Sequence, residues 1–187
     1  DQTPGMRDGD KLMSAIKNRL TRSNVGPEAK KDKLLSEFAI LQTSFRLNEV
    51  NDTLGKTPLK FYTEFLNEHV FKNIKYQKTS EDFIGRFYGE FMSYSGGDGQ
   101  TLGIILTPRH ITDLMCELVN IQADDVVLDP TCGTAGFLIS AMHRMLSMAD
   151  SESKRRNIKK KQLHGFELQS NMFAVAAANM ILREDGN

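Results

Sequence analysis

The order of apolar and polar positions divides the chain into a helical first half and a second half where short strands alternate with helices. Before residue 95, apolar residues recur three and four positions apart, which is the period of an amphipathic helix. Four helices are predicted, over about residues 11–20, 27–45, 57–74 and 80–91. The aromatic residues of the last segment share one face, and this spacing favours a core role over a partner surface.

The second half contains a strand, a glycine-containing turn and a helix in succession. Residues 126–128 are apolar and β-branched in part, as in a buried strand, and Asp129-Pro130 ends it. Gly133 and Gly136 lack a Cβ and therefore allow a turn to pass close to a ligand. Apolar residues then recur at helical spacing over 137–146. Such a unit can present free backbone N–H groups to a nucleotide-like ligand, although an ordinary β-α connection has the same pattern.

A second strand is predicted at 162–167, and it ends at Glu167. In nucleotide-binding βαβ units an acid at this point accepts hydrogen bonds from ribose hydroxyls. A plain surface glutamate is the alternative. The interval between the glycines and Glu167 exceeds the roughly 20 residues usual in dinucleotide folds, and the excess fits an insertion at 151–161. This insertion is basic, and we expect a solvated, mobile loop rather than a contact with DNA phosphates.

The segment before the first strand predicts a helix with an exposed start. Thr107 suits the N-cap and Pro108 the first helical position. Five apolar residues between 111 and 119 fall on one side of this helix, so that its N-terminus is free to face a carboxylate. The glycine-rich stretch 95–100 is the clearest linker. The predicted division is a helical N-terminal domain at 1–94, the linker at 95–100 and a ligand-binding part at 101–187.

Composition narrows the functional classes. The chain has 24 Lys and Arg against 24 Asp and Glu, so its net charge of zero argues against a strongly basic nucleic-acid platform. No run of 18 apolar residues and no hydrophobic signal segment is present, which predicts a protein without a membrane span. The two cysteines form no CxxC pair and no Cys/His cluster has metal-ligand spacing, so we expect a cytoplasmic protein without a metal.

Four segments resemble those of a known family. Residues 129–138, Asp-Pro-Thr-Cys-Gly-Thr-Ala-Gly-Phe-Leu, resemble the D-P-x-x-G-[ST]-[AG]-G-F-L motif of N6-adenine DNA methyltransferases. They look most like the modification subunit of type I restriction-modification systems. Residues 102–111 resemble that family's G-x-x-[FL]-T-P-R-x-[IV] segment, and 164–180 resemble its G-x-E…A…N-M stretch. Residues 81–91 resemble a helix that precedes the domain, so the likeness covers about residues 80–187.

The resemblance implies an α/β fold, namely an incomplete Rossmann-like S-adenosylmethionine-dependent methyltransferase fold preceded by an α-helical N-terminal domain. It implies that the backbone of 133–136 passes under the methionine part of the cofactor and that Asp129 lies near its amino group. Glu167 would accept from the ribose, and 107–109 would close over the cofactor. The cofactor-binding residues implied are Leu106, Thr107, Pro108, Arg109, Asp129, Pro130, Gly133, Thr134, Ala135, Gly136, Phe137 and Glu167.

The catalytic loop of this family, [DNS]-P-P-[YFW], has no counterpart in the chain, because no two of its five prolines are adjacent. We therefore expect no catalytic residues here, and a chain that holds the front part of the enzyme and is inactive alone. Cys132 lies in the cofactor turn, unlike the nucleophile of cytosine C5-methyltransferases, and is expected to be a packing residue. The resemblance implies double-stranded DNA, a specificity subunit and a restriction nuclease subunit as partners.

Two other functions stay open at this point. The chain could be a non-catalytic S-adenosylmethionine-fold module for DNA binding or subunit assembly. A dehydrogenase is disfavoured because G-x-x-G, rather than G-x-G-x-x-G, follows the strand.

Overall fold

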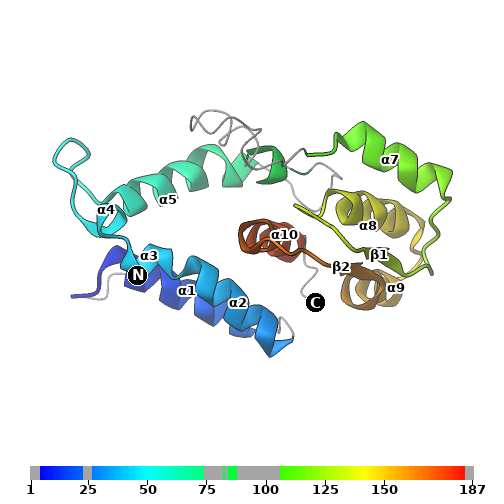
Figure 1. The fold of residues 1–187 in the computed structure, drawn as a ribbon, viewed down its shortest axis with the longest axis horizontal. Coiled ribbons are helices and arrows are strands. Elements are labelled where there is room, and N and C mark those ends of the chain that lie inside the picture. Colours follow the sequence, from blue (N-terminus) through cyan, green and yellow to red (C-terminus); the bar gives the residue numbers. More distant parts are fainter. Residues whose placement is uncertain (1–4, 23–26, 74–81, 83, 88–105, 184–187) are drawn as a thin grey trace. The chain divides into compact units, whose positions relative to one another are not determined.

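The computed structural model describes residues 5–22, 27–73, 82, 84–87 and 106–183. The chain forms two compact units, residues 1–75 and 76–187 (Figure 1). The linker predicted at 95–100 lies outside the described residues. The division into 1–94, 95–100 and 101–187 therefore stays a prediction.

The first unit is helical, in agreement with the apolar spacing. Its elements are α1 (Asp8–Arg22), α2 (Glu28–Phe38), α3 (Ile40–Thr43), α4 (Phe45–Asn48), α5 (Pro58–His69) and the short 3-10 helix η1 (Phe71–Asn73). The single helix predicted over 27–45 is divided because the backbone at Ser44 is extended, with ψ 112°. Helix α5 begins as its sequence predicts: Thr57 is the N-cap, its side chain accepts from the backbone N–H of Lys60, and Pro58 is the first helical residue.

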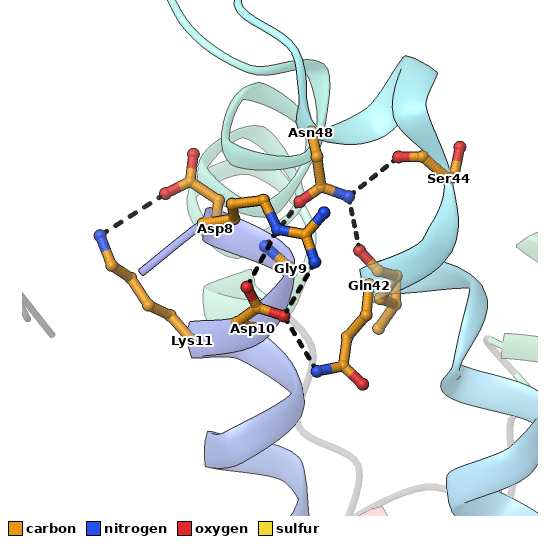
Figure 2. Close-up of polar contacts among 9 residues, drawn as sticks. Asp8, Gly9, Asp10, Lys11, Gln42, Ser44 and Asn48 are labelled. Carbon is orange, nitrogen blue, oxygen red and sulfur yellow. Dashed lines mark hydrogen bonds and ion pairs between the residues drawn. The ribbon is translucent and has the colours of Figure 1, made fainter. Parts of the chain in front are cut away.

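The side chain of Asn48 ties α4 to α1 and α3 (Figure 2). Its Oδ1 accepts from the backbone N–H of Gly9 at 2.8 Å, and its Nδ2 donates to the carbonyls of Leu41 at 2.8 Å and Ser44 at 2.9 Å. A Cβ at position 9 would fall on the Leu41 carbonyl, so glycine is required for this approach. One amide side chain thus bonds to backbone groups of three segments, and the Ser44 carbonyl also accepts from the N–H of Leu47.

The second unit contains a βαβ arrangement. Its elements are α7 (Arg109–Leu118), β1 (Val127–Asp129), α8 (Gly136–Met148), α9 (Glu152–Asn157), η3 (Ile158–Gln162, a π-helical turn), β2 (Leu163–Gly165) and α10 (Ser170–Leu182), with a further helical segment at 84–87. The two strands pair in parallel, with Val127 opposite Leu163 and Asp129 opposite Gly165. Helix α8 packs against both strands and against α7 (Figure 1). The buried face of α8 supplies much of the core through Leu138, Ile139, Met142 and Met145.

The basic segment between α8 and β2 is helical, so the prediction of a mobile loop is wrong. Ser151 caps α9, its Oγ accepting from the N–H of Lys154 at 3.2 Å. Ile158 is fully buried, and Gln162 donates to the carbonyls of Ala123 at 3.0 Å and Asp125 at 2.6 Å. These apolar and polar anchors at the C-terminal end of the segment hold it against the unit.

Helix α7 differs from its prediction in two respects. It begins at Arg109, after an extended Pro108, and no side chain caps it, so Thr107 is not its N-cap. Its apolar side is exposed, with exposed fractions from 37% for Ile111 to 75% for Leu118. The helix packs on α8 through the other side instead, where Thr112 and Cys116 are buried.

The aromatic stripe predicted near residue 80–91 is described only at Phe87. This side chain is 51% exposed, so the predicted core role is wrong for Phe87. Phe83 and Phe91 lie outside the described residues. Within the described ranges, no helix combines the length and apolar character needed to cross a membrane.

Candidate functional site

The turn after β1 is held against the segment that follows β2. The Oδ1 of Asp129 accepts from the N–H of Thr131 at 3.1 Å, which starts the turn. Beyond the strands, the N–H of Phe166 donates to the Asp129 carbonyl and the N–H of Cys132 donates to the Phe166 carbonyl, both at 2.9 Å. The two chain segments therefore stay paired for several residues past the ends of the strands.

Two residues of this turn have left-handed backbones. Gly133 has φ 54°, and Ala135, the residue that precedes α8, has φ 72°. For a residue with a side chain this conformation costs roughly 1–2 kcal/mol. An added Cβ at Gly133 would meet nothing within 4 Å, so one side of the turn is open. No side chain caps α8, and its positive N-terminal end is available to an anion.

Glu167 is bonded to the turn. Its Oε2 accepts from the N–H of Gly133 at 2.9 Å, and its Oε1 accepts from the N–H of Gln169 at 2.7 Å. The sequence prediction brought Gly133 and Glu167 together, and the structure places them in direct contact across 34 residues of sequence.

Cys132 lies between the acidic groups of this region. Burial raises the pKa of its thiol to about 11, with further contributions from the negative charges of Asp129 and Glu167. The thiolate, which is the nucleophilic form, is therefore disfavoured at neutral pH. A Cβ added at Gly165 would come within 2.9 Å of the Cys132 Sγ, so the sulfur fills the space beside β2. These contacts support the prediction of a packing residue.

Two cavities lie beside the βαβ arrangement. The larger, of about 400 Å³, brings together three predicted site residues upstream of α7, the first residue of α7 and one residue at the start of α8, with four further residues. Its lining consists of Leu106, Thr107, Pro108, Arg109 and Gly136 from the predicted set, together with Asp82, Arg86, His110 and Thr112. Its walls thus carry both a carboxylate and guanidinium groups.

The second cavity, of about 280 Å³, is mainly apolar and is lined by Asp129, Pro130 and Phe137 together with residues of α7, β1 and α8. Within the turn itself, Thr134 and Ala135 are buried. Among the described residues, Gly133 and Glu167 do not line either of these two cavities.

Asp82 also belongs to this region, although no motif indicated it. Its Oδ1 accepts from the N–H of Gly85 at 2.7 Å and from the side-chain amide of Asn179 at 2.6 Å. Its Oδ2 accepts from the hydroxyl of Thr134 at 2.6 Å. An aspartate that accepts from the N–H three residues later is typical of a helix N-cap. No local sequence pattern indicates that Asp82 also contacts Thr134, 52 residues later.

Asn179 of α10 completes this cluster. It is fully buried, and its amide also donates to the Thr134 carbonyl at 2.9 Å. Thr134 is therefore held through both its hydroxyl and its carbonyl. In the part of the chain that the structure describes, no three His, Cys, Asp or Glu side chains are arranged to hold a metal ion.

Comparisons with known proteins agree with the resemblance seen in the motifs. The family model described as N-6 DNA Methylase matches residues 79–186. The chain is 47% identical over 182 residues to the Type II restriction enzyme and methyltransferase RM.BcgI of Heyndrickxia coagulans, covering 97% of this chain and 28% of that protein. It is 25% identical over 125 residues to the Type I restriction enzyme MjaIX methylase subunit of Methanocaldococcus jannaschii, covering 65% and 21%.

Among solved structures, the chain is similar to one from a type I R-M system described for its complex assembly and conformational transition. The TM-score is 0.55 at 24% identity, with 94% of this chain and 34% of that chain covered, and this likeness concerns the fold alone. The chain spans less than a third of the length of these curated relatives. Because the family match includes the upstream segment, β1, the turn, β2 and α10, the chain belongs to the N-6 DNA Methylase family.

Proposed function

We propose that this chain supplies the S-adenosylmethionine-binding part of a DNA adenine-N6 methyltransferase of a restriction-modification system. The observation that carries the proposal is the cavity of about 400 Å³ where residues 106–110 meet the start of α8 at Gly136. These are the two regions that the family motifs expect to enclose the cofactor. They are separate in sequence, and the folding of α7 against α8 brings them together.

The charges around this cavity suit the amino-acid end of the cofactor. Its carboxylate would lie near the uncapped N-terminus of α8 and the side chains of Arg86 and Arg109. At the other end of the turn, the carboxylate of Glu167 could accept from ribose hydroxyls, beside the open face of Gly133. The bound cofactor supplies an electrophilic methyl group, and the residues of this chain bind and orient it.

The fold proposed for the complete domain is Rossmann-like. Parallel sheets are normally covered on both faces and contain more than two strands. Val126 just before β1, Leu128 within β1 and Phe166 after β2 are 66%, 57% and 65% exposed, which fits a sheet that continues in a longer chain. The Pro-Pro-aromatic loop would then lie in that continuation.

The partners proposed are double-stranded DNA, a specificity subunit and a restriction nuclease subunit, in a cytoplasmic assembly. The 47%-identical relative carries both a restriction enzyme and a methyltransferase in its name, and it matches 97% of this chain. This relative favours a nuclease in the same polypeptide over a separate subunit. Cleavage of unmethylated DNA by the complete protein without an added nuclease would distinguish the two arrangements.

Calorimetric titration of the chain with S-adenosylmethionine and with NAD tests the cofactor assignment. We expect saturable binding of S-adenosylmethionine only, accompanied by a higher melting temperature. Glu167→Ala should lower the affinity for S-adenosylmethionine by about tenfold, the equivalent of roughly 1.4 kcal/mol of hydrogen bonding. The matched control is Glu152→Ala, an exposed acid of α9. Preferential binding of NAD would contradict the proposal.

Methylation assays test the reaction itself. The complete protein should transfer methyl groups to adenine in duplex DNA, and the 187-residue chain alone should not. Adenine methylation by the chain alone would refute its inactivity. A complete protein that binds S-adenosylmethionine and DNA but transfers no methyl group would support the alternative, a non-catalytic module for DNA binding or assembly.

A further inference from the structure

A closed ring of hydrogen bonds lies behind the turn. The carboxylate of Asp82 accepts from the Thr134 hydroxyl and from the Asn179 amide, and the same amide donates to the Thr134 carbonyl. Three segments of the second unit therefore meet at Thr134: the start of the helical segment 84–87, the turn, and α10. Two members of the ring are shielded from water, since Thr134 is 4% exposed and Asn179 is fully buried, whereas Asp82 is half-buried.

The position of the Asp82 carboxylate depends on glycine at 85 and faces the cavity. A Cβ at Gly85 would fall on the carboxylate, so a larger residue there would displace it. On the other side, the Asp82 Oδ2 lies 3.9 Å from where a Cβ of Gly136 would be. The oxygen that accepts from Thr134 thus also borders the cavity of about 400 Å³ at the start of α8.

Thr134 lies between the two left-handed residues, Gly133 and Ala135. Glycine adopts a positive φ at no steric cost, but Ala135 does not, and its conformation is sparsely populated unless its surroundings hold it. The ring holds Thr134 at its side chain and at its carbonyl, which leaves the turn little freedom to relax.

We propose that Asp82 is a positioning residue for the cofactor site, which holds Thr134, and through Thr134 the turn 133–135, in the shape that receives the amino-acid end of S-adenosylmethionine. The proposal rests on the proposed function. It assigns to a residue before the glycine motif a part in cofactor binding without direct contact to the cofactor.

Two substitutions separate positioning from direct charge contact. Asp82→Asn keeps one oxygen for the Gly85 N–H and the Asn179 amide, and it presents an NH₂ group from which the Thr134 hydroxyl can accept. Asp82→Ala removes every acceptor. Asp124→Ala is the matched control, because this exposed acid is paired with Lys154 at the surface.

Calorimetry with two ligands gives the decisive comparison. S-Adenosylmethionine has the amino-acid end, and 5′-methylthioadenosine lacks it. We expect Asp82→Ala to lower the affinity for S-adenosylmethionine about tenfold or more and to change the affinity for methylthioadenosine by less than about threefold. Asp82→Asn should keep the affinity of the unaltered chain for both ligands. Equal weakening of both ligands, no weakening, or an Asp82→Asn variant as weak as Asp82→Ala would each overturn the proposal. Failure of the unaltered chain to bind S-adenosylmethionine would instead contradict the proposed function.

A second measurement needs no ligand. In a Cys116→Ala background, the alkylation rate of Cys132 reports on the turn, because this thiol lies two residues before Thr134. Asp82→Ala and Thr134→Val should both raise the rate about threefold or more, and Asp82→Asn should not, since only the first two remove the bond that holds the turn. If Asp82→Ala does not fold, Thr134→Val provides the same test. Rates unchanged in Thr134→Val and in any folded Asp82→Ala protein would overturn the positioning role.

Discussion

Each unit of the chain contains a hydrogen-bond network centred on an asparagine, and the two asparagines bond to different kinds of partner. In the first unit Asn48, half-buried, bonds only to backbone groups, those of Gly9, Leu41 and Ser44. In the second unit Asn179, fully buried, bonds to the Asp82 carboxylate and the Thr134 carbonyl. Both side chains connect segments that are distant in sequence.

The difference separates a scaffold from a site. A network of backbone groups and one neutral amide satisfies polar groups at the ends of helices. A network that includes a partly buried carboxylate is costly unless every member is satisfied. Both cavities described above lie in the second unit, and the carboxylate borders one of them. The charged network around Asp82 therefore borders the cavity proposed for the cofactor, and each network can be tested separately.

Asn179→Ala should have the largest effect. It removes the partner of the Asp82 carboxylate and of the Thr134 carbonyl in a dry environment, and we expect a loss of about 3 kcal/mol in the free energy of unfolding of the second unit. Urea denaturation measures it. Asn171→Ala, exposed at the start of α10, is the control and should cost less than about 0.5 kcal/mol. A loss below 1 kcal/mol for Asn179→Ala would show that water replaces the amide and would remove the contrast between the networks.

Asn48→Ala should cost less, about 1.5 kcal/mol, because Asn48 is only half-buried and its partners are neutral backbone groups. The effect should be local to the first unit. Amide hydrogen exchange of Gly9 measures it directly, since this N–H donates to the Asn48 side chain. Ser44→Ala is the matched control, because the Asn48 amide bonds to the Ser44 carbonyl, which the substitution keeps. Protection of Gly9 that survives Asn48→Ala would contradict the role assigned to this network.

The Cys132 thiol allows a test of the charge near the turn. Its pKa is raised to about 11 by burial and by Asp129 and Glu167, so alkylation by iodoacetamide at pH 8 should be about a hundredfold slower than for an unperturbed cysteine. The rate should rise steadily toward pH 11, and Glu167→Gln should increase it at each pH. Because the folded-state pKa is raised, the protonated thiol favours folding below pH 9.0, and this contribution is lost as the pH rises toward 11. The Cys132→Ala variant should not show this loss of stability at high pH. In the alkylation experiment, a rate that levels off near pH 9 would contradict the raised pKa.

The local part of the fold could be predicted from the sequence. The strand at 126–128, the turn and the helix after it follow from the change of apolar period and from the glycines, and they correspond to β1 and α8. Thr57-Pro58 marked the start of α5 correctly, because an N-cap and a first-position proline act within one helical turn. The same reasoning was wrong for Thr107, where the extended Pro108 is itself the residue before α7.

The long-range part could not be predicted. The spacing of apolar residues would place the apolar side of α7 in a core. The structure instead buries the opposite side, where the Thr112 Oγ1 and the Ser140 Oγ share a hydrogen bond of 2.7 Å. The basic run before β2 looked like a loop because its single buried apolar residue, Ile158, is too sparse for a periodic signal. Asp82 was missed for a similar reason: its partners lie 52 and 97 residues away, and no local spacing encodes such contacts.

The smallest expected effect concerns the backbone strain at Ala135, next to the network of Asp82, Thr134 and Asn179. Among the described residues, non-glycine residues with positive φ occur only in the second unit, at Asn120 and Ala135, whereas those of the first unit are glycines. Ala135→Gly relieves roughly 1 kcal/mol of left-handed strain but loses a buried methyl group of roughly 0.8 kcal/mol, so the free energy of unfolding should change by less than about 0.5 kcal/mol. Ala141→Gly, equally buried but within α8, has no strain to relieve and should cost about 1.5 kcal/mol. Equal losses in the two variants, measured by urea denaturation, would show that the turn stores no strain.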